Sequence, residues 1–184
     1  MISSNLLCLA ILSLGYANAD KACANIDTVV EAAREHKVEE EILLSLIYEE
    51  STWKVRSKSH KGACGLTQVV PKWSISGYTC KDLLDPEKSI FEGAKHLSFW
   101  YYDYARGKSY TVALCGYNRG YRCKKPGINK ERGYEYARSI IRRARRIKRK
   151  AARLEEEREV CDRYYTIFRG ECFQERPDYH LHQR

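Results

Sequence analysis

The chain has 184 residues, which favours one domain or one domain with an appendage. Hydrophobic residues make up 43% and charged residues 31%, so the composition excludes a fully disordered or a collagen-like chain. The formal net charge is +9, from 33 Lys and Arg against 24 Asp and Glu. This charge favours an acidic partner without choosing among nucleic acid, anionic lipid and an acidic cell-wall polymer.

The N-terminus has the pattern of an export signal. Residues 6–14 are almost wholly apolar, and Ala17-Asn18-Ala19 offers small residues where a signal peptidase reads the chain. We therefore expect residues 1–19 to be a signal peptide cleaved before Asp20, which exports the chain to the periplasm or the outside. The alternative is an N-terminal helix buried in the fold. No other apolar run approaches the roughly 20 residues of a membrane-spanning helix, so we expect no transmembrane anchor.

Removing residues 1–19 also removes Cys8 and leaves seven cysteines in a compartment that permits disulfides. Three close pairs suggest themselves, although sequence alone cannot fix the connectivity. Cys23 is then left unpaired. A zinc site is disfavoured because the chain has no C-x-x-C pair and its histidines are not clustered. The three pairs are Cys64–Cys80, Cys115–Cys123 and Cys161–Cys172.

Helical patterns dominate the first two thirds of the chain. Residues 26–36 and 38–50 predict two helices, and the Ser-, Gly- and Lys-rich residues 51–71 predict a long ordered loop. Asp85-Pro86 is a strong helix start, and that helix is expected to reach about Ala105. Residues 110–117 predict a shorter helix. Since no segment alternates cleanly between apolar and polar residues, the fold class is mainly α.

The C-terminal third predicts one long helix over residues 131–160. Nine Lys and Arg and no acidic residue lie between Arg138 and Arg153, and four Glu follow by residue 159. The basic stretch is either a solvated helix face or an arm that holds an anionic surface or polymer. We place a boundary at residues 145/146, after which residues 146–184 form a helical extension and a disulfide-stapled tail. One narrow apolar stripe runs along the helix: Tyr136, Ile140, Ala144, Ile147, Ala151 and Leu154.

Glu50 is the best candidate for chemistry. An apolar helix delivers it to a C-terminal end, close to Trp53. Apolar neighbours and the negative end of the helix dipole both raise the pKa of a carboxyl there, as a general acid near neutral pH requires. The adjacent Glu49 lies about 100° round the helix and is expected to face solvent.

Four further segments follow Glu50 in order. Residues 62–71 hold two glycines, which allow close backbone approach, and Gln68, whose amide both donates and accepts. Residues 84–90 open the predicted helix at Asp85. Residues 113–120 end another helix with an aromatic, an amide and a turn glycine. Residues 134–138 begin the long helix.

In this order and spacing, residues 25–145 resemble the lytic transglycosylase family with the soluble-transglycosylase (SLT, goose-lysozyme-like) domain. The family's Gly-Ala-x-Gly-Leu-x-Gln-x-x-Pro is met in full by residues 62–71, and its Glu-Ser-x-aromatic by residues 50–53. Three features depart from the family pattern: Ser89 replaces Asn, Gly116 replaces the Ala of Ala-Tyr-Asn-x-Gly, and the Glu-Thr step before the family's late Tyr is lost. The family's late Tyr maps to Tyr136, with Tyr134 as the alternative register.

The resemblance implies a lysozyme-like α domain over residues 20–145 that cleaves the β-1,4 bond between N-acetylmuramic acid and N-acetylglucosamine in peptidoglycan. Glu50 would act as the single catalytic acid and base and leave a 1,6-anhydro sugar. The resemblance implies neither a metal nor an organic cofactor. Substrate contacts would come from Ser51, Gln68, Tyr117, Asn118 and Tyr136.

Other functions stay open at this point. A goose-type hydrolase would use the same Glu but let water attack, and a catalytically silent module would only bind the wall. We expect peptidoglycan strands as the partner and no nucleic acid, because export makes a nucleic-acid binder a poor reading of the basic stretch. We also expect a monomer. A free-standing periplasmic enzyme, a component of an envelope-spanning secretion machine and a phage protein all fit the sequence.

Overall fold

The computed structural model describes residues 3–168 and the side chains of residues 3–161. It confirms a mainly α fold, and no β-strand occurs in the described part of the chain beyond two isolated bridges. Among the described helices, none is both long and apolar enough to cross a membrane. The helices are α1 (Ser4–Ser13), α2 (Ala19–Ala24), α3 (Ile26–Glu35), α4 (Glu40–Ser51), η1 (Pro71–Trp73), α5 (Cys80–Leu83), α6 (Pro86–Phe99), η2 (Trp100–Tyr104), α7 (Tyr110–Arg119), η3 (Gly120–Lys124) and α8 (Ile128–Phe168).

Helix α4 is the buried centre of the fold. Every residue from 41 to 47 is buried, so the helix is enclosed on all sides rather than on one stripe. It packs against α8, α3 and α6. A helix fixed in this way holds its C-terminal end, where Glu50 lies, in one place.

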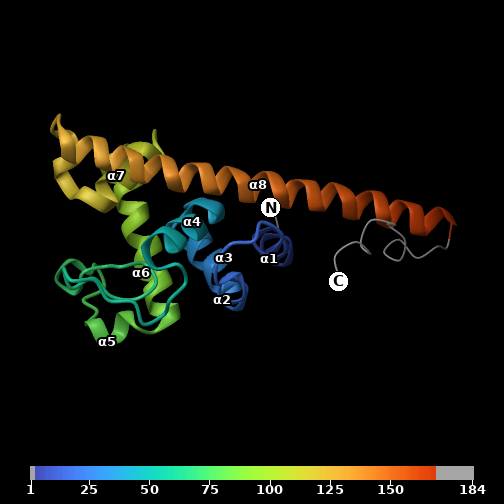
Figure 1. Cartoon of the computed structure of the whole chain (residues 1–184), viewed down its shortest axis with the longest axis horizontal. Helices are drawn as coiled ribbons and strands as arrows, with labels where there is room; N and C mark the ends of the chain where they lie inside the picture. The colour runs from blue at the N-terminus through green and yellow to red at the C-terminus, as the bar shows by residue number, and fades with distance from the viewer. Residues whose placement is uncertain (1–2, 169–184) are drawn as a thin grey trace, which may run out of the picture.

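Helix α8 is one continuous rod, and most of the molecule lies on one side of it (Figure 1). The apolar stripe predicted from the sequence faces the core: Ile140, Ala144, Ile147 and Ala151 are buried against α1, α4 and α7. The helix runs without a break through the predicted boundary at 145/146, and Ile147 and Ala151 belong to the same core as the residues before it.

Helix α6 ends earlier than the sequence pattern indicates, because the chain widens into the π-helical turn η2 at Trp100. The indole of Trp100 lies directly on the backbone of α7: a Cβ added at Gly116 would meet a Trp100 ring carbon at 2.3 Å. Position 116 therefore has no room for the alanine of the family pattern. Gly116 has no side chain, and this absence makes room for the large Trp100 side chain.

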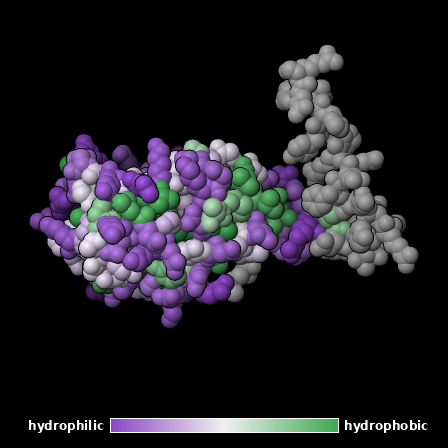
Figure 2. Space-filling model, turned by 90° about the horizontal axis from the view of Figure 1, so that it is seen from below, coloured by the Kyte–Doolittle hydropathy of each residue, from purple (hydrophilic) through white to green (hydrophobic). Residues whose placement is uncertain are grey.

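The N-terminal segment forms helix α1, which packs into the fold. Leu7, Ala10 and Ile11 of α1 are buried, and α1 packs against α8. Leu9 and Leu12 stay exposed, and the face shown in Figure 2 carries hydrophobic patches within a mostly hydrophilic surface. This arrangement corresponds to the alternative reading of residues 1–19, the buried helix.

The prediction that Cys23 is unpaired is wrong for the chain that contains Cys8, because Cys23 is bonded to Cys8 there. The sequence reasoning missed this bond because it set residues 1–19 aside and Cys8 with them. The Cys64–Cys80 and Cys115–Cys123 pairs are confirmed. The predicted partner of Cys161, Cys172, lies outside the described residues.

Candidate active site

Glu50 lies in the last turn of α4. The two residues just after that helix have a backbone conformation that residues other than glycine rarely adopt. Thr52 and Trp53 both have positive φ, 50° and 60°. Two contacts hold this turn: the Trp53 side chain is only 2% exposed, and the Asn18 amide donates to the Thr52 carbonyl at 2.9 Å. The chain after Glu50 is therefore fixed from both the core and the N-terminal segment.

The carboxyl of Glu50 has one direct side-chain partner, the phenol of Tyr136 on α8, which donates to Oε1. Of the two tyrosines that the motif could match, Tyr136 is the one that makes this contact. Burial raises the pKa of Glu50 to about 7. The Tyr136 bond lowers that pKa and the neighbouring Glu49 raises it. A large fraction of Glu50 is thus protonated near neutral pH, as a proton donor must be.

Tyr117 of α7 completes this cluster. Burial, and then the charge of Glu50, raise the pKa of both Tyr117 and Tyr136, so both phenols remain donors. The Tyr117 hydroxyl donates to the Thr67 carbonyl at 2.8 Å. Helices α4, α7 and α8 and the loop over residues 51–70 thus meet at Glu50.

Gln68 is tied into its own loop. It has a positive φ of 52°, and its Nε2 donates to the carbonyls of Gly65 at 2.8 Å and Ser57 at 3.2 Å. Because those two bonds use the amide hydrogens, the carbonyl oxygen is the part of Gln68 left for a ligand.

Thr67 and Ser89 form a buried pair that joins this loop to α6. The Thr67 hydroxyl donates to the Ser89 carbonyl at 2.7 Å, and the Thr67 backbone N–H donates to the Ser89 hydroxyl at 3.2 Å. Ser89, which departs from the family's Asn, thus holds the loop through its neighbour Thr67. The sequence analysis noted the departure at 89 but did not connect it to Thr67.

The remaining two predicted contact residues differ in accessibility. Ser51 is 6% exposed, and its hydroxyl donates to the Ile47 carbonyl of the same helix at 3.1 Å. Asn118, at the end of α7, is exposed and makes no side-chain hydrogen bond to another described residue. Its amide is therefore available to a ligand, whereas that of Gln68 is only partly so.

Glu49 points away from this cluster and is bound by α8. Its carboxylate accepts from Arg143 at 3.0 Å and from Ser139 at 3.0 Å. Arg143 also lies 4.4 Å from the centre of the Tyr48 ring. One arginine of the basic stretch is thus a clamp between α8 and α4, a role that the sequence analysis missed.

Glu92 holds a loop through its buried carboxylate, a contact that the sequence analysis missed. Its side chain is 1% exposed, and Oε1 accepts three hydrogen bonds from one loop. Burial raises the pKa of Glu92, but these bonds outweigh it, so the pKa lies below its usual value and the group is charged. The donors are the Ser74 hydroxyl at 2.8 Å, the Ile75 N–H at 2.6 Å and the Ser76 N–H at 3.3 Å.

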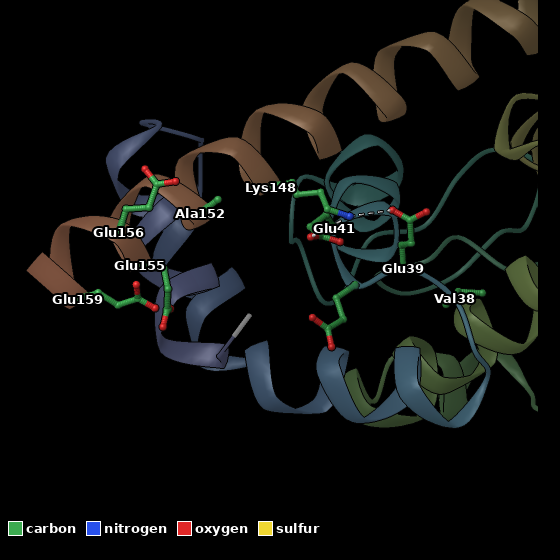
Figure 3. A pocket seen from close by; sticks show the side chains of 9 residues that line it. Val38, Glu39, Glu41, Lys148, Ala152, Glu155, Glu156 and Glu159 are labelled. Atoms are coloured by element: carbon green, nitrogen blue, oxygen red, sulfur yellow. Dashed lines mark ion pairs between the residues drawn. The ribbon is translucent and has the colours of Figure 1, made fainter. Parts of the chain in front are cut away.

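A hollow of about 650 Å³ lies away from this cluster, where α8 passes the start of α4 (Figure 3). On one side of the hollow, Lys148 forms ion pairs with Glu39 at 3.6 Å and with Glu41 at 3.9 Å. Glu155, Glu156 and Glu159 line its other side. No group of metal-ligating side chains occurs here or elsewhere among residues whose side chains are described.

Comparison with known proteins places this geometry in context. Residues 27–140 match the family described as the transglycosylase SLT domain. The soluble lytic murein transglycosylases of Escherichia coli K12 and of Escherichia coli O157:H7 are each 33% identical to the chain over 86 residues. That match covers 42% of this chain and 13% of each relative, so the chain spans only a small part of their length.

A solved structure has a similar fold. It is an inactive mutant of the lytic transglycosylase Slt from Pseudomonas aeruginosa, with a TM-score of 0.56 and 19% sequence identity. The match covers 64% of this chain and 23% of that chain. At this identity the likeness concerns the fold alone.

Proposed function

The chain belongs to the transglycosylase SLT domain family, and on that basis we propose that it is a peptidoglycan lytic transglycosylase. The bond cleaved is the β-1,4 bond between N-acetylmuramic acid and N-acetylglucosamine. The observation that carries the proposal is the Glu50–Tyr136 contact, which joins a carboxyl of raised pKa to a phenol on another helix.

Glu50 acts first as an acid and then as a base. Its proton passes to the glycosidic oxygen as the bond from that oxygen to C1 breaks, and the carboxylate then takes the proton of the C6 hydroxyl. The C6 oxygen bonds to C1 and closes a 1,6-anhydro ring without water. The sugar's acetamido group stabilises the oxocarbenium ion in place of a protein nucleophile. The binding of Glu49 to Arg143 and Ser139 supports this scheme, because it turns the nearest second carboxylate elsewhere.

The other candidate substrate contacts differ in which of their polar atoms are not already hydrogen-bonded within the protein. Tyr136 and Tyr117 line the site beside Glu50 and keep their protons. Asn118 offers a free amide, and Gln68 offers its carbonyl oxygen. Ser51 contributes as a support for the turn after Glu50, with its hydroxyl bonded inside the helix.

Export follows from the substrate, since peptidoglycan lies outside the cytoplasm. We retain cleavage between Ala19 and Asp20 as part of this proposal. Such cleavage would remove Cys8, the partner of Cys23, and Asn18, the donor to Thr52.

The product distinguishes the proposed reaction from hydrolysis. Incubation of purified peptidoglycan with the protein is expected to release muropeptides that are one water lighter than the products of a muramidase. Mass spectrometry of the soluble fraction measures this difference. Products of hydrolytic mass would assign the chain to the hydrolases of this fold, and an absence of products would favour a wall-binding module.

Tyr136→Phe is expected to move the alkaline limit of activity to higher pH. The Tyr136 bond lowers the pKa of Glu50, so its loss raises that pKa and keeps the acid protonated at higher pH. The measurement is the upper midpoint of the pH–rate profile.

Tyr134→Phe is the matched control, because Tyr134 lies on the same helix without a bond to Glu50 and should leave the midpoint in place. An equal midpoint in parent and Tyr136→Phe contradicts the assignment.

A further inference from the structure

Four arginines form a straight ridge along the back of α8. Arg138, Arg142, Arg145 and Arg149 recur at steps of four, three and four, which at 3.6 residues per turn places them on one stripe about 16 Å long. All four are exposed. We call these four residues the basic ridge. It lies diametrically opposite the stripe of Ile140, Ala144 and Ile147 that faces the core.

The charge of the basic ridge is not neutralised within the described residues. Four other cations of α8 have carboxylate partners: Arg143 binds Glu49, Lys148 binds Glu39 and Glu41, Arg153 binds Glu157, and Arg158 binds Glu155. The four ridge arginines make no ion pair with any described side chain.

The direction of the ridge separates it from the catalytic cluster. Tyr136 reaches inward to Glu50, whereas Arg138, two residues later, lies about 200° further round the helix. Most of the molecule lies on the inward side of α8 (Figure 1). A ligand held by the ridge is therefore held on the side of α8 away from Glu50.

We propose that the basic ridge docks the protein on a bilayer that carries anionic phospholipid, with the catalytic side turned away from the membrane. A ridge on a straight helix can place all four side chains on one plane, and guanidinium groups suit phosphate oxygens. The orientation rests on the proposed function: it presents Glu50 to a glycan layer above the bilayer, whereas a glycan strand held by the ridge would lie away from Glu50.

The docking is electrostatic and does not involve insertion. No large hydrophobic side chain is exposed between residues 129 and 159 of α8, so the ridge has no apolar anchor beside it. Binding of this kind weakens steeply as salt screens the charges, and each Arg near an anionic surface adds to it.

Co-sedimentation with vesicles tests the proposal. The full chain is expected to bind phosphatidylcholine vesicles that contain phosphatidylglycerol, to ignore pure phosphatidylcholine vesicles, and to be released by ~0.5 M salt. Replacing all four ridge arginines by Gln should weaken binding at least about 100-fold. Replacing them by Lys should retain most of it.

The matched control removes four exposed cations elsewhere and leaves the ridge intact: Arg34, Lys108, Arg122 and Lys125, each to Gln. Equal binding by the ridge variant and this control overturns the proposal, as does ridge-dependent binding to duplex DNA or purified walls in the absence of binding to anionic vesicles. Turnover of small soluble muropeptides, which should be the same in ridge variant and parent, reports on the proposed function separately. An inactive parent that binds anionic vesicles through the ridge would contradict the enzyme and uphold the docking.

Discussion

Glu50→Gln is expected to lower peptidoglycan cleavage by at least about 100-fold, the lower range for loss of general acid–base catalysis. The amide keeps the size of the side chain and an oxygen that can accept from Tyr136, but it carries no proton to give. Release of soluble muropeptides from purified walls measures the loss. A variant that clears walls at the parent rate would remove Glu50 from the mechanism.

The stability of the same variant gives an independent check. The pKa of Glu50 is raised in the folded protein, so the parent loses stability as the pH rises from about 4.5 to about 7, because the carboxyl ionises in the unfolded chain while the folded protein keeps it protonated. Gln cannot ionise, so the Glu50→Gln variant does not lose stability in this way. The unfolding free energy of the variant relative to that of the parent should therefore rise across that pH window and then level off. Denaturant titrations of both proteins at several pH values measure this difference.

Glu49→Gln is the matched control at the neighbouring position. Its carboxylate is bound to Arg143 on a partly exposed surface, a pair worth about 0–1 kcal/mol. Cleavage should therefore stay close to that of the parent, while the melting temperature falls slightly. A comparable loss of activity in both variants would mean that helix α4, and not the Glu50 carboxyl, is being disturbed.

Gly65→Ala is expected to destabilise the fold by at least about 3 kcal/mol. Gly65 has a φ of +78°, and an added Cβ would lie 1.8 Å from the Leu83 carbonyl and 2.6 Å from the Ser89 hydroxyl. The backbone would have to separate the loop from α5 and α6, and the Thr67–Ser89 bonds would be lost with it. A protein of this size should melt roughly 10 °C lower.

Gly62→Ala separates the effect of the positive φ from the effect of the close contacts that an added Cβ makes. Gly62 has a similar φ of +81° but nothing within 4 Å of the added Cβ. Only the backbone conformation is penalised there, by roughly 1–2 kcal/mol. Thermal melts of the two variants under oxidising conditions make the comparison. An equal fall in melting temperature in the two variants would show that the close contacts at Gly65 do not contribute to the destabilisation.

The sequence predicted the helices well where the signal is local. The Asp85 cap, the apolar stripe of α8 and the helix that carries Glu50 are all patterns within one segment, and each is observed. The Asp85 side chain does accept from the Lys88 N–H. The role of Tyr136 came from the resemblance to the family and not from a local pattern, since Tyr136 lies 86 residues after its partner Glu50.

What the sequence could not predict depends on pairs of residues far apart in the chain. Arg143 belonged by pattern to a basic stretch, and only the packing of α8 on α4 turns it toward Glu49 and Tyr48. Glu92 drew no prediction from the sequence, because the loop donors that it binds come from residues 74–76. A carboxylate and its backbone donors leave no periodic mark in a sequence.

The contact between Trp100 and Gly116 has a consequence for comparing relatives. Restoring the family's alanine at 116 while Trp100 remains would place a methyl group inside an indole ring, so the residue tolerated in other members is harmful in this one. The two positions are epistatic: the effect of either exchange depends on the residue at the other. Sequence swaps between relatives have to move positions 100 and 116 together, and a single-site tolerance measured in one member does not transfer to this chain.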